Sequence, residues 1–244
     1  MQELSVSPNP AVPHRIVFRD EHLLVVEKPS GVVTQPGKKH EHDSLLNGLF
    51  AQFGNRLQNL GESRDWGLLH RLDKDTSGLV IVALTVPAFE NLLDQFKRRL
   101  IKKLYWAIVL GSPRPAQGVI QKPIREAVGL RKRAVIDRDG EQAVTAYKVL
   151  ESGEGVSLIE ARPKTGRLHQ IRVHMASLGN PVLGDHEYSA RLKLPNVRRL
   201  CLHAAALSFL HPATSHRQIV ESAWPVDLHK TLKRFGLHEP SLPG

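Results

Sequence analysis

The chain has 244 residues, 41% hydrophobic and 24% charged, and this ordinary globular composition excludes a disordered or fibrous protein. Its 34 Lys and Arg residues outnumber its 24 Asp and Glu residues, and the resulting formal net charge of +10 favours an anionic partner such as RNA or DNA. A membrane surface is the rival anion, but no apolar run approaches the roughly 18 residues of a spanning helix and the basic residues are scattered, which argues against it.

The cysteine content and the first residues bear on the compartment. A single cysteine, Cys201, cannot form an internal disulfide or a cysteine-based zinc site. Residues 1–13 contain three prolines and lack the apolar core of a secretory signal. We therefore expect a cytoplasmic protein in which residues 1–14 form a flexible N-terminal extension.

In the first third of the chain, two short β-branched runs at residues 15–18 and 22–26 predict a β-hairpin. Ser44 is expected to cap a helix formed by the apolar run that follows it. A buried strand is expected at residues 79–84. The segment of residues 70–78 is then predicted to be a loop that runs into this strand.

The middle third combines one helix with several strands. Apolar residues recur at helical spacing after Pro87 and predict an amphipathic helix with basic residues near its end. Residues 127–140 are expected to form a mobile basic loop. The strands expected around this loop are residues 103–110, 119–123, 143–150 and 156–161.

The last third begins with a helix predicted over residues 167–178 and closed by Gly179. His169 and Arg172 lie three residues apart on it and are expected to share a face. Strands at 200–209 and 218–222 and a final helix at 226–235 follow.

Many strands in succession with few helices between them indicate the α+β class, with a mainly antiparallel mixed sheet and flanking helices. We expect one domain over residues 15–235 and a C-terminal tail over 236–244.

Two segments concentrate the chemistry. Residues 70–78 place the carboxylate of Asp73 among cations, and residues 164–174 supply many hydrogen-bond donors and no acid. We expect the two segments to build one site around that carboxylate, suited to a polyanionic substrate.

Several ordered motifs support this interpretation. In chain order they are HRLD at 70–73 with TSG at 76–78, KKLY at 102–105, AVTAY at 143–147, TGR at 165–167, HQIRVH at 169–174, GD at 184–185, LHA at 202–204 and HP at 211–212. Over residues 16–212 the chain resembles the RluA-type family of RNA pseudouridine synthases. The resemblance implies the catalytic fold of pseudouridine synthases and an isomerase that uses neither a metal nor a cofactor.

The implied reaction breaks the N1–C1′ bond of a uridine in RNA, turns the uracil and joins C5 to C1′. Asp73 matches the catalytic aspartate of the family, and an aspartate is normally ionised at neutral pH. The sequence leaves open whether this carboxylate attacks C1′ or removes the 2′-proton. It also leaves the alternative that Asp73 only caps a turn or pairs with Arg71.

The resemblance implies four substrate-binding residues. Arg172 matches the arginine that pairs with the aspartate, where a guanidinium keeps a carboxylate ionised and oriented; the alternative is a solvated helix charge. Tyr105 matches the tyrosine that packs against uracil, and the alternative is a core aromatic residue. Arg71 matches a residue that enters the gap left by the flipped nucleotide, or it binds phosphate. His169 is a weaker candidate for phosphate contact.

The same residues argue against two other functions. Asp73 and Asp75 lie too close in sequence to promise the two opposed acids of a glycosidase. His169 and His174 lack the spacing of a helical zinc site, so no metal is expected. The alternative from another class is a non-catalytic RNA-binding or ribosome-assembly protein.

Many relatives carry an N-terminal S4-type RNA-binding domain. Because about 14 residues precede the first predicted strand, we expect no S4 domain here, with RNA capture resting on the catalytic domain. Residues 97–103 and 125–138 are the expected phosphate contacts. The RNA is expected to be ribosomal or transfer RNA, and the protein a monomer.

Overall fold

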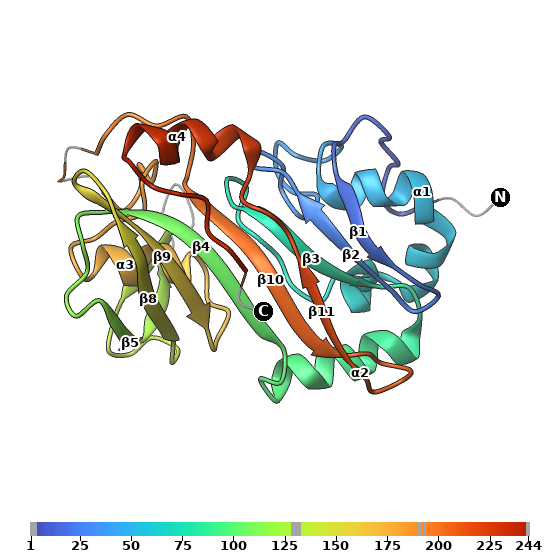
Figure 1. Cartoon of the computed structure of the whole chain (residues 1–244). Coiled ribbons are helices and arrows are strands. Elements are labelled where there is room, and N and C mark those ends of the chain that lie inside the picture. The colour runs from blue at the N-terminus through green and yellow to red at the C-terminus, as the bar shows by residue number, and fades with distance from the viewer. Residues whose placement is uncertain (1–3, 128–132, 190–191, 193, 243–244) are drawn as a thin grey trace. The chain divides into compact units, whose positions relative to one another are not determined.

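The computed structural model describes residues 4–127, 133–189, 192 and 194–242 (Figure 1). The chain divides into two compact units. The first comprises residues 1–101 and 206–222, and the second comprises residues 102–205 and 223–244.

The first unit is built on a β-sheet. Its strands are β1 (Arg15–Arg19), β2 (Leu23–Lys28), β3 (Ser77–Ala83), the end of β10 (Leu202–Leu210) and β11 (Arg217–Glu221). They lie in the order β1-β2-β3-β10, and β11 pairs with β10. The β1–β2, β2–β3 and β10–β11 pairs are antiparallel, so the predicted N-terminal hairpin is confirmed.

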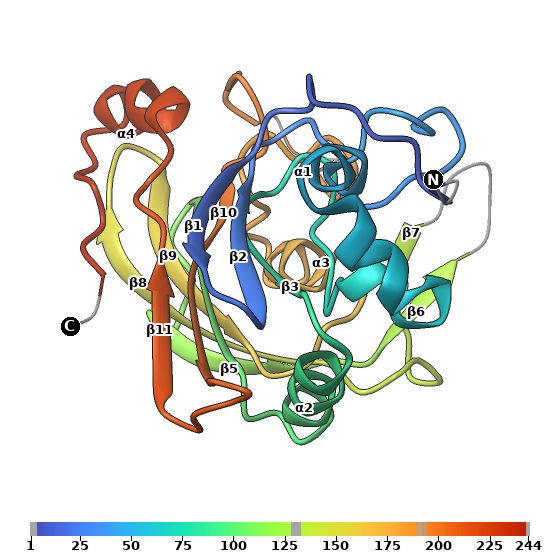
Figure 2. The ribbon, with the colours of Figure 1, turned by 90° about the vertical axis from the view of Figure 1, so that its right-hand side faces the viewer.

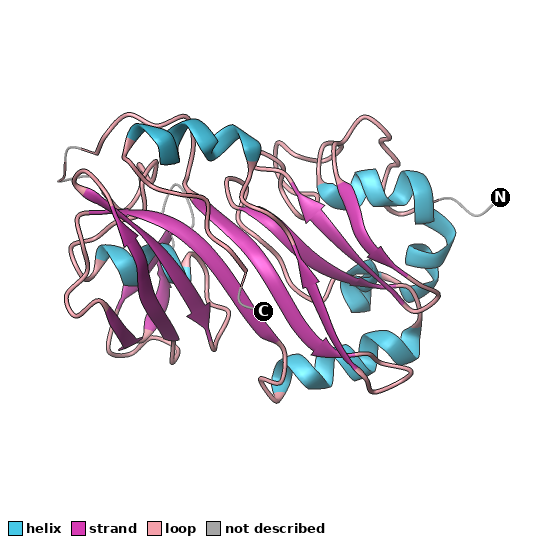
Figure 3. Ribbon diagram, in the orientation of Figure 1, coloured by secondary structure: helices cyan, strands magenta, loops and turns pink. Residues whose placement is uncertain are grey.

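Two helices with side-chain caps flank these strands (Figure 3). The first, α1 (Leu45–Leu60), starts as predicted at Ser44, whose hydroxyl accepts the N–H of Asn47 at 3.2 Å while the Asn47 side chain accepts the N–H of Ser44 at 3.0 Å. The second, α2 (Val86–Lys97), is capped by Thr85. A 3₁₀ segment, η1 (Glu62–Gly67), follows α1.

A continuous apolar cluster holds α2 against the sheet of this unit. Its buried members come from β2, β3, α2, the residue before β4, β10 and β11: Leu23, Val25, Leu79, Ile81, Leu92, Ile101, Leu207, Phe209 and Val220. Burial of such side chains stabilises the fold by about 1.5–3 kcal/mol each.

Residues 4–14, which the sequence predicts to be flexible, pack against α1. The backbone N–H of Asn9 donates to the carbonyl of Asn47 at 2.9 Å, and the Asn47 amide donates to the carbonyl of Ser7 at 2.8 Å. Val6 and Val12 are buried. Two isolated valines make no periodic pattern, so this contact is not predictable from the sequence.

The second unit contains a second run of antiparallel strands. They are β4 (Lys102–Leu110), β5 (Gln117–Gln121), β8 (Val144–Ser152), β9 (Val156–Pro163) and the first residues of β10. Their order is β10-β4-β9-β8-β5, with antiparallel pairing of β4 to β9, β9 to β8 and β8 to β5. The predicted α+β class with mainly antiparallel pairing is confirmed.

A separate two-stranded hairpin also belongs to this unit (Figure 2). It joins β6 (Ile124–Ala127) to β7 (Arg133–Ile136), so the prediction of a mobile loop over 127–140 is wrong at residues 133–136. Ala134 is fully buried against Ile124, and that burial is what sequence reasoning missed in so short and basic a stretch. Residues 128–132 lie outside the described part of the chain.

The helices of this unit are short. The predicted helix at 167–178 is α3 (Gln170–Ala176), which begins late because His169 adopts a left-handed conformation with φ of 49°. The predicted final helix consists of a 3₁₀ turn, η2 (Val226–Leu228), and α4 (His229–Arg234). Among the described residues, no helix is long and apolar enough to cross a membrane.

Candidate active site

Asp73 lies on a loop whose backbone is fixed just before it. The loop leads into β3, and Asp73 itself is half-buried. The hydroxyl of the buried Thr34 donates to the carbonyl of Leu72 at 2.8 Å and accepts the N–H of the same residue at 3.1 Å. The N–H of Thr76 donates to the Asp73 carbonyl at 3.1 Å and closes a turn.

A buried lysine fixes the loop just after Asp73. Lys28, at the end of β2, is fully buried, and its ammonium donates to the carbonyls of Pro29, Val32 and Lys74 at 3.0, 2.6 and 3.1 Å. The N–H of Gly31 donates to the same Lys74 carbonyl at 2.8 Å. The carboxylate therefore stands on a backbone held from both sides, and the sequence analysis did not single out Lys28.

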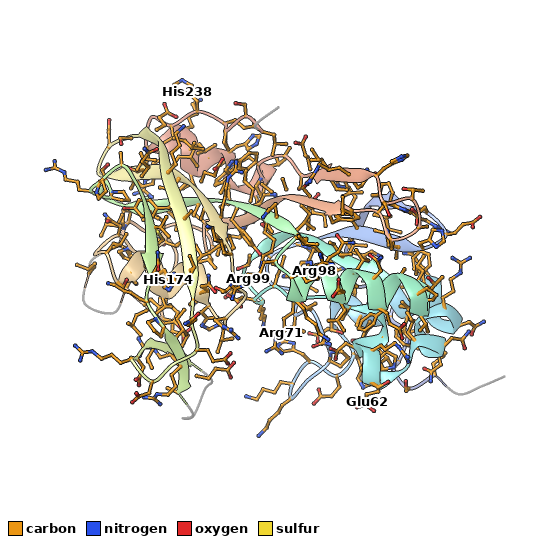
Figure 4. The ribbon with its side chains drawn as sticks, turned by 90° about the horizontal axis from the view of Figure 1, so that it is seen from below. Glu62, Arg71, Arg98, Arg99, His174 and His238 are labelled. Carbon is orange, nitrogen blue, oxygen red and sulfur yellow. The ribbon has the colours of Figure 1, made fainter. Side chains whose placement is uncertain are left out.

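Three exposed arginines of the first unit carry predicted RNA contacts. Arg71 is exposed beside Asp73 in sequence, and Arg98 and Arg99 are exposed just after α2 (Figure 4). Arg98 also pairs with Asp94 at 3.2 Å on the surface. Their exposure is compatible with phosphate binding, which stays a prediction for these residues.

Tyr105 lies on β4 in the second unit, where 9% of its surface is exposed. Lys103 is two residues earlier on the same strand and therefore faces the same side. Its ammonium donates to the carbonyl of Thr165 at 3.3 Å, and burial lowers the pKa of Lys103 to about 8. The uracil contact predicted for Tyr105 stays a prediction, and so does the phosphate contact predicted for Lys103 as part of residues 97–103.

Arg172 is held by two acidic residues of its own unit. Its Nε donates to Oδ2 of Asp185 at 2.7 Å, its Nη2 donates to Oδ1 of Asp185 at 3.0 Å, and Nη2 also donates to Glu187 at 3.1 Å. Only 9% of Arg172 is exposed, so the alternative of a solvated helix charge is wrong. The pairing with Asp73 joins residues of different units and stays a prediction.

His169 stands directly before α3 and is half-buried. Its Nδ1 lies 2.8 Å from the hydroxyl of Tyr188 and 3.4 Å from a carboxylate oxygen of Glu187. Arg172 contacts Glu187 as well, as expected for two residues on one face. Its phosphate contact stays a prediction.

Gln170 and His174 of the segment at 164–174 make buried hydrogen bonds. Buried Gln170 accepts from the Thr165 hydroxyl at 2.7 Å and donates to the hydroxyl of Thr145 at 2.9 Å. His174 (Figure 4) has Nδ1 2.9 Å from the same Thr145 hydroxyl and Nε2 3.0 Å from the carbonyl of Lys122. Burial lowers the pKa of His174, although the backbone bond to Lys122 opposes this. These bonds attach α3 to β8.

The comparison with known families settles the class of the protein. The family model described as RNA pseudouridylate synthase matches residues 22–177, which fall in both units. The chain belongs to this family. The enzyme class predicted from the sequence, an isomerase that acts on RNA, is thereby confirmed, while the prediction of one domain over 15–235 stays a prediction.

Curated relatives of this pseudouridine synthase carry specific names. The ribosomal large subunit pseudouridine synthase D of Zymomonas mobilis is 40% identical over 231 residues, which cover 91% of this chain and 73% of the relative. The protein of the same name from Pseudomonas aeruginosa is 40% identical over 225 residues, which cover 87% of this chain and 68% of the relative.

Solved structures agree with this assignment. Human RNA pseudouridylate synthase domain containing 4 matches with a TM-score of 0.72 and 27% identity, over 93% of this chain and 95% of that one. Human RNA pseudouridylate synthase domain containing 1 matches with a TM-score of 0.71 and 27% identity, over 98% and 94%. The predicted pseudouridine synthase fold is confirmed.

Proposed function

We propose that this pseudouridine synthase isomerises specific uridines in structured RNA, with Asp73 as the catalytic carboxylate. The observation that carries the proposal is the loop of Asp73, whose backbone is fixed on both sides by Thr34 and Lys28 while the side chain stays half-buried. A carboxylate on a rigid support keeps one orientation toward a sugar, and such preorganisation lowers the cost of reaching the transition state.

The other predicted residues take supporting roles in this proposal. Arg172 is the counter-ion of Asp73, since a guanidinium stays charged and offers several donors. Tyr105 packs against the uracil of the flipped nucleotide, where an aromatic face regains about 1–3 kcal/mol of lost base stacking. Arg71 fills the gap in the RNA or binds phosphate, and His169 binds phosphate.

The names of the relatives favour one RNA over the other. Two relatives that are 40% identical are named ribosomal large subunit pseudouridine synthase D. We therefore propose a uridine of ribosomal RNA as the target, with transfer RNA as the alternative. A cytoplasmic location and a monomeric enzyme without metal or cofactor belong to the same proposal.

The proposal is tested by tritium release from RNA that carries tritium at C5 of uridine. The wild-type enzyme should release tritium to water, because the C5 proton leaves in this isomerisation. Release should persist with chelator present, because the proposed reaction uses no metal. Asp73→Asn should lower release by about a thousandfold or more, since the carboxylate is removed from the reacting sugar. Asp75→Asn is the matched control because Asp75 is an exposed acid two residues away, and it should largely retain activity.

Two outcomes would contradict the proposal. Release unaffected by Asp73→Asn would remove the catalytic role from this residue. A folded wild-type protein that binds ribosomal and transfer RNA tightly but releases no tritium would favour the alternative of a non-catalytic RNA-binding protein.

A further inference from the structure

Tyr188 contacts both β7 and the residue before α3 in the second unit, and no role was predicted for it from the sequence motifs. Its hydroxyl accepts the backbone N–H of Ala134 on β7 at 2.9 Å and lies 2.8 Å from Nδ1 of His169 before α3. The hydroxyl proton is not used in the bond from Ala134, so the hydroxyl is able to donate it to His169 when Nδ1 carries no proton. Burial raises the pKa of Tyr188 to about 12, so the hydroxyl remains protonated under assay conditions.

The ring of Tyr188 meets two guanidinium groups. The Arg172 guanidinium carbon lies 5.1 Å from the ring centroid, and that of Arg133 on β7 lies 5.3 Å from it. An aromatic face attracts a cation at such distances, and arginine is the most frequent partner. The ring therefore contacts both the arginine of the proposed site and an arginine of the β6–β7 hairpin.

The edge of the Arg172 guanidinium is fixed separately. The side chain of Asp185 is fully buried and accepts hydrogen bonds from Nε and Nη2 of Arg172. Its Oδ1 also accepts the backbone N–H groups of Glu187 at 3.0 Å and Tyr188 at 3.2 Å. A carboxylate bound at the edge sets direction within the plane of the guanidinium, and an aromatic face sets its tilt. Asp185 and Tyr188 thus define the two aspects of its orientation.

We propose that Tyr188 is a positioning residue for Arg172 and that it couples the β6–β7 hairpin to α3. Arg133 supports the coupling, because its Nη2 donates to the carbonyl of Glu187 at 2.9 Å and its guanidinium lies over the Tyr188 ring. RNA that engages the hairpin then acts on Glu187 and Tyr188, which both contact Arg172. The proposal rests on the proposed function only through the role given to Arg172.

Kinetics separate positioning from a merely structural role. Single-turnover tritium release with excess enzyme, at concentrations that saturate the RNA, gives the rate constant for the reaction of bound RNA. The dependence of the observed rate constant on enzyme concentration gives the RNA Kd. Tyr188→Leu removes the ring and should lower the rate constant about tenfold or more. Tyr188→Phe keeps the ring and removes the hydroxyl; it should leave the rate constant within about threefold and raise the RNA Kd about three- to tenfold.

Tyr147→Phe is the matched control. Tyr147 is a buried tyrosine of the same unit, and its hydroxyl donates to the carbonyl of Pro115 at 3.0 Å, away from the Arg172 contacts. This variant should change neither the rate constant nor the RNA Kd. An equal increase of the RNA Kd in Tyr147→Phe and Tyr188→Phe would show a general packing effect and overturn the coupling.

A readout without catalysis keeps the proposal separable from the proposed function. The amide of Ala134 should exchange its hydrogen faster in Tyr188→Phe than in the wild type, because its acceptor is lost. Unchanged exchange together with an unchanged RNA Kd would overturn the coupling, and a folded Tyr188→Leu with the wild-type rate constant would overturn the positioning role. If the wild type is inactive but the Ala134 amide still exchanges faster in Tyr188→Phe than in the wild type, the proposed function is refuted and the coupling is retained.

Discussion

At the scale of single residues, the least expected feature is the buried ammonium of Lys28. A charged group in the protein interior is costly unless hydrogen bonds surround it, and three backbone carbonyls do so here. Two of these carbonyls, of Pro29 and Val32, belong to the loop that follows β2, and the third belongs to Lys74 in the loop of Asp73. One side chain therefore holds the two loops together. The Lys28 ammonium binds these carbonyl oxygens in place of water, and it thereby helps to fix the backbone next to Asp73.

Lys28→Met should therefore reduce both stability and activity. Three carbonyl oxygens lose the ammonium donor, of which the Lys74 carbonyl keeps the N–H of Gly31, and we expect the free energy of unfolding to fall by about 2–4 kcal/mol. Urea denaturation measures the loss, and tritium release should fall with it. Lys74→Met replaces an exposed lysine of the neighbouring loop and should stay within about 0.5 kcal/mol of the wild type; an equal loss in both variants would contradict the role of Lys28.

His174 should make stability depend on pH. Its pKa is lowered in the folded protein, so the unfolded chain binds the proton more readily. Its contribution to stability is complete above its ordinary value of about 6.5 and is lost as the pH falls toward the folded value, by at most about 1.4 kcal/mol per pH unit. Urea unfolding of wild type and His174→Gln between pH 5 and 7.5 should show a steeper acid loss in the wild type; parallel curves would contradict this.

At the scale of secondary-structure elements, the sequence predicted what local pattern controls. Ser44, the hairpin of β1 and β2, and α2 follow from caps, β-branched runs and helical spacing, all of which act within a few residues. The β6–β7 hairpin was missed because its burial depends on contacts with α3 and the residue before β8. The partners of Arg172 were missed for the same reason, since Asp185 lies 13 residues further along the chain and meets it only in the folded structure.

The β6–β7 hairpin should contribute RNA affinity rather than chemistry. Arg131 and Lys132 belong to the stretch between its two strands, outside the described residues. Replacing both by alanine should weaken RNA binding and reduce the slope of log Kd against log salt by about one to two, because each phosphate contact releases counterions. The rate constant at saturating RNA should not change.

The control for this double variant is Lys148→Ala. Lys148 is an exposed lysine of the same unit on β8. It should leave both the Kd and its salt dependence unchanged. A salt slope equal in the double variant and the wild type would remove the hairpin from the RNA contact.

At the scale of the whole molecule, the first unit is assembled from two distant stretches of chain. Residues 1–101 supply most of it, and residues 206–222 supply the end of β10 and all of β11. Leu207, Phe209 and Val220 from the second stretch are part of the apolar cluster beneath α2. The first stretch alone therefore lacks a strand neighbour for β3 and part of its core.

A fragment of residues 1–101 should consequently fail to fold cooperatively. Loss of three large apolar side chains from one cluster removes about 5–9 kcal/mol of burial, comparable with the whole stability of a domain. Circular dichroism during urea titration should show a broad change without a sigmoidal transition, in contrast to the full chain. A sharp transition in the fragment would contradict this dependence on β10 and β11.

The split of this first unit has a consequence during synthesis on the ribosome. The nascent chain emerges from its N-terminus at about 5–20 residues per second, so β3 cannot pair with β10 until most of the protein has been translated. Throughout that interval the open edge of a very apolar strand is available to other chains or to chaperones. Translation speed over the second unit, rather than over the first, then decides how long that nascent edge stays uncovered.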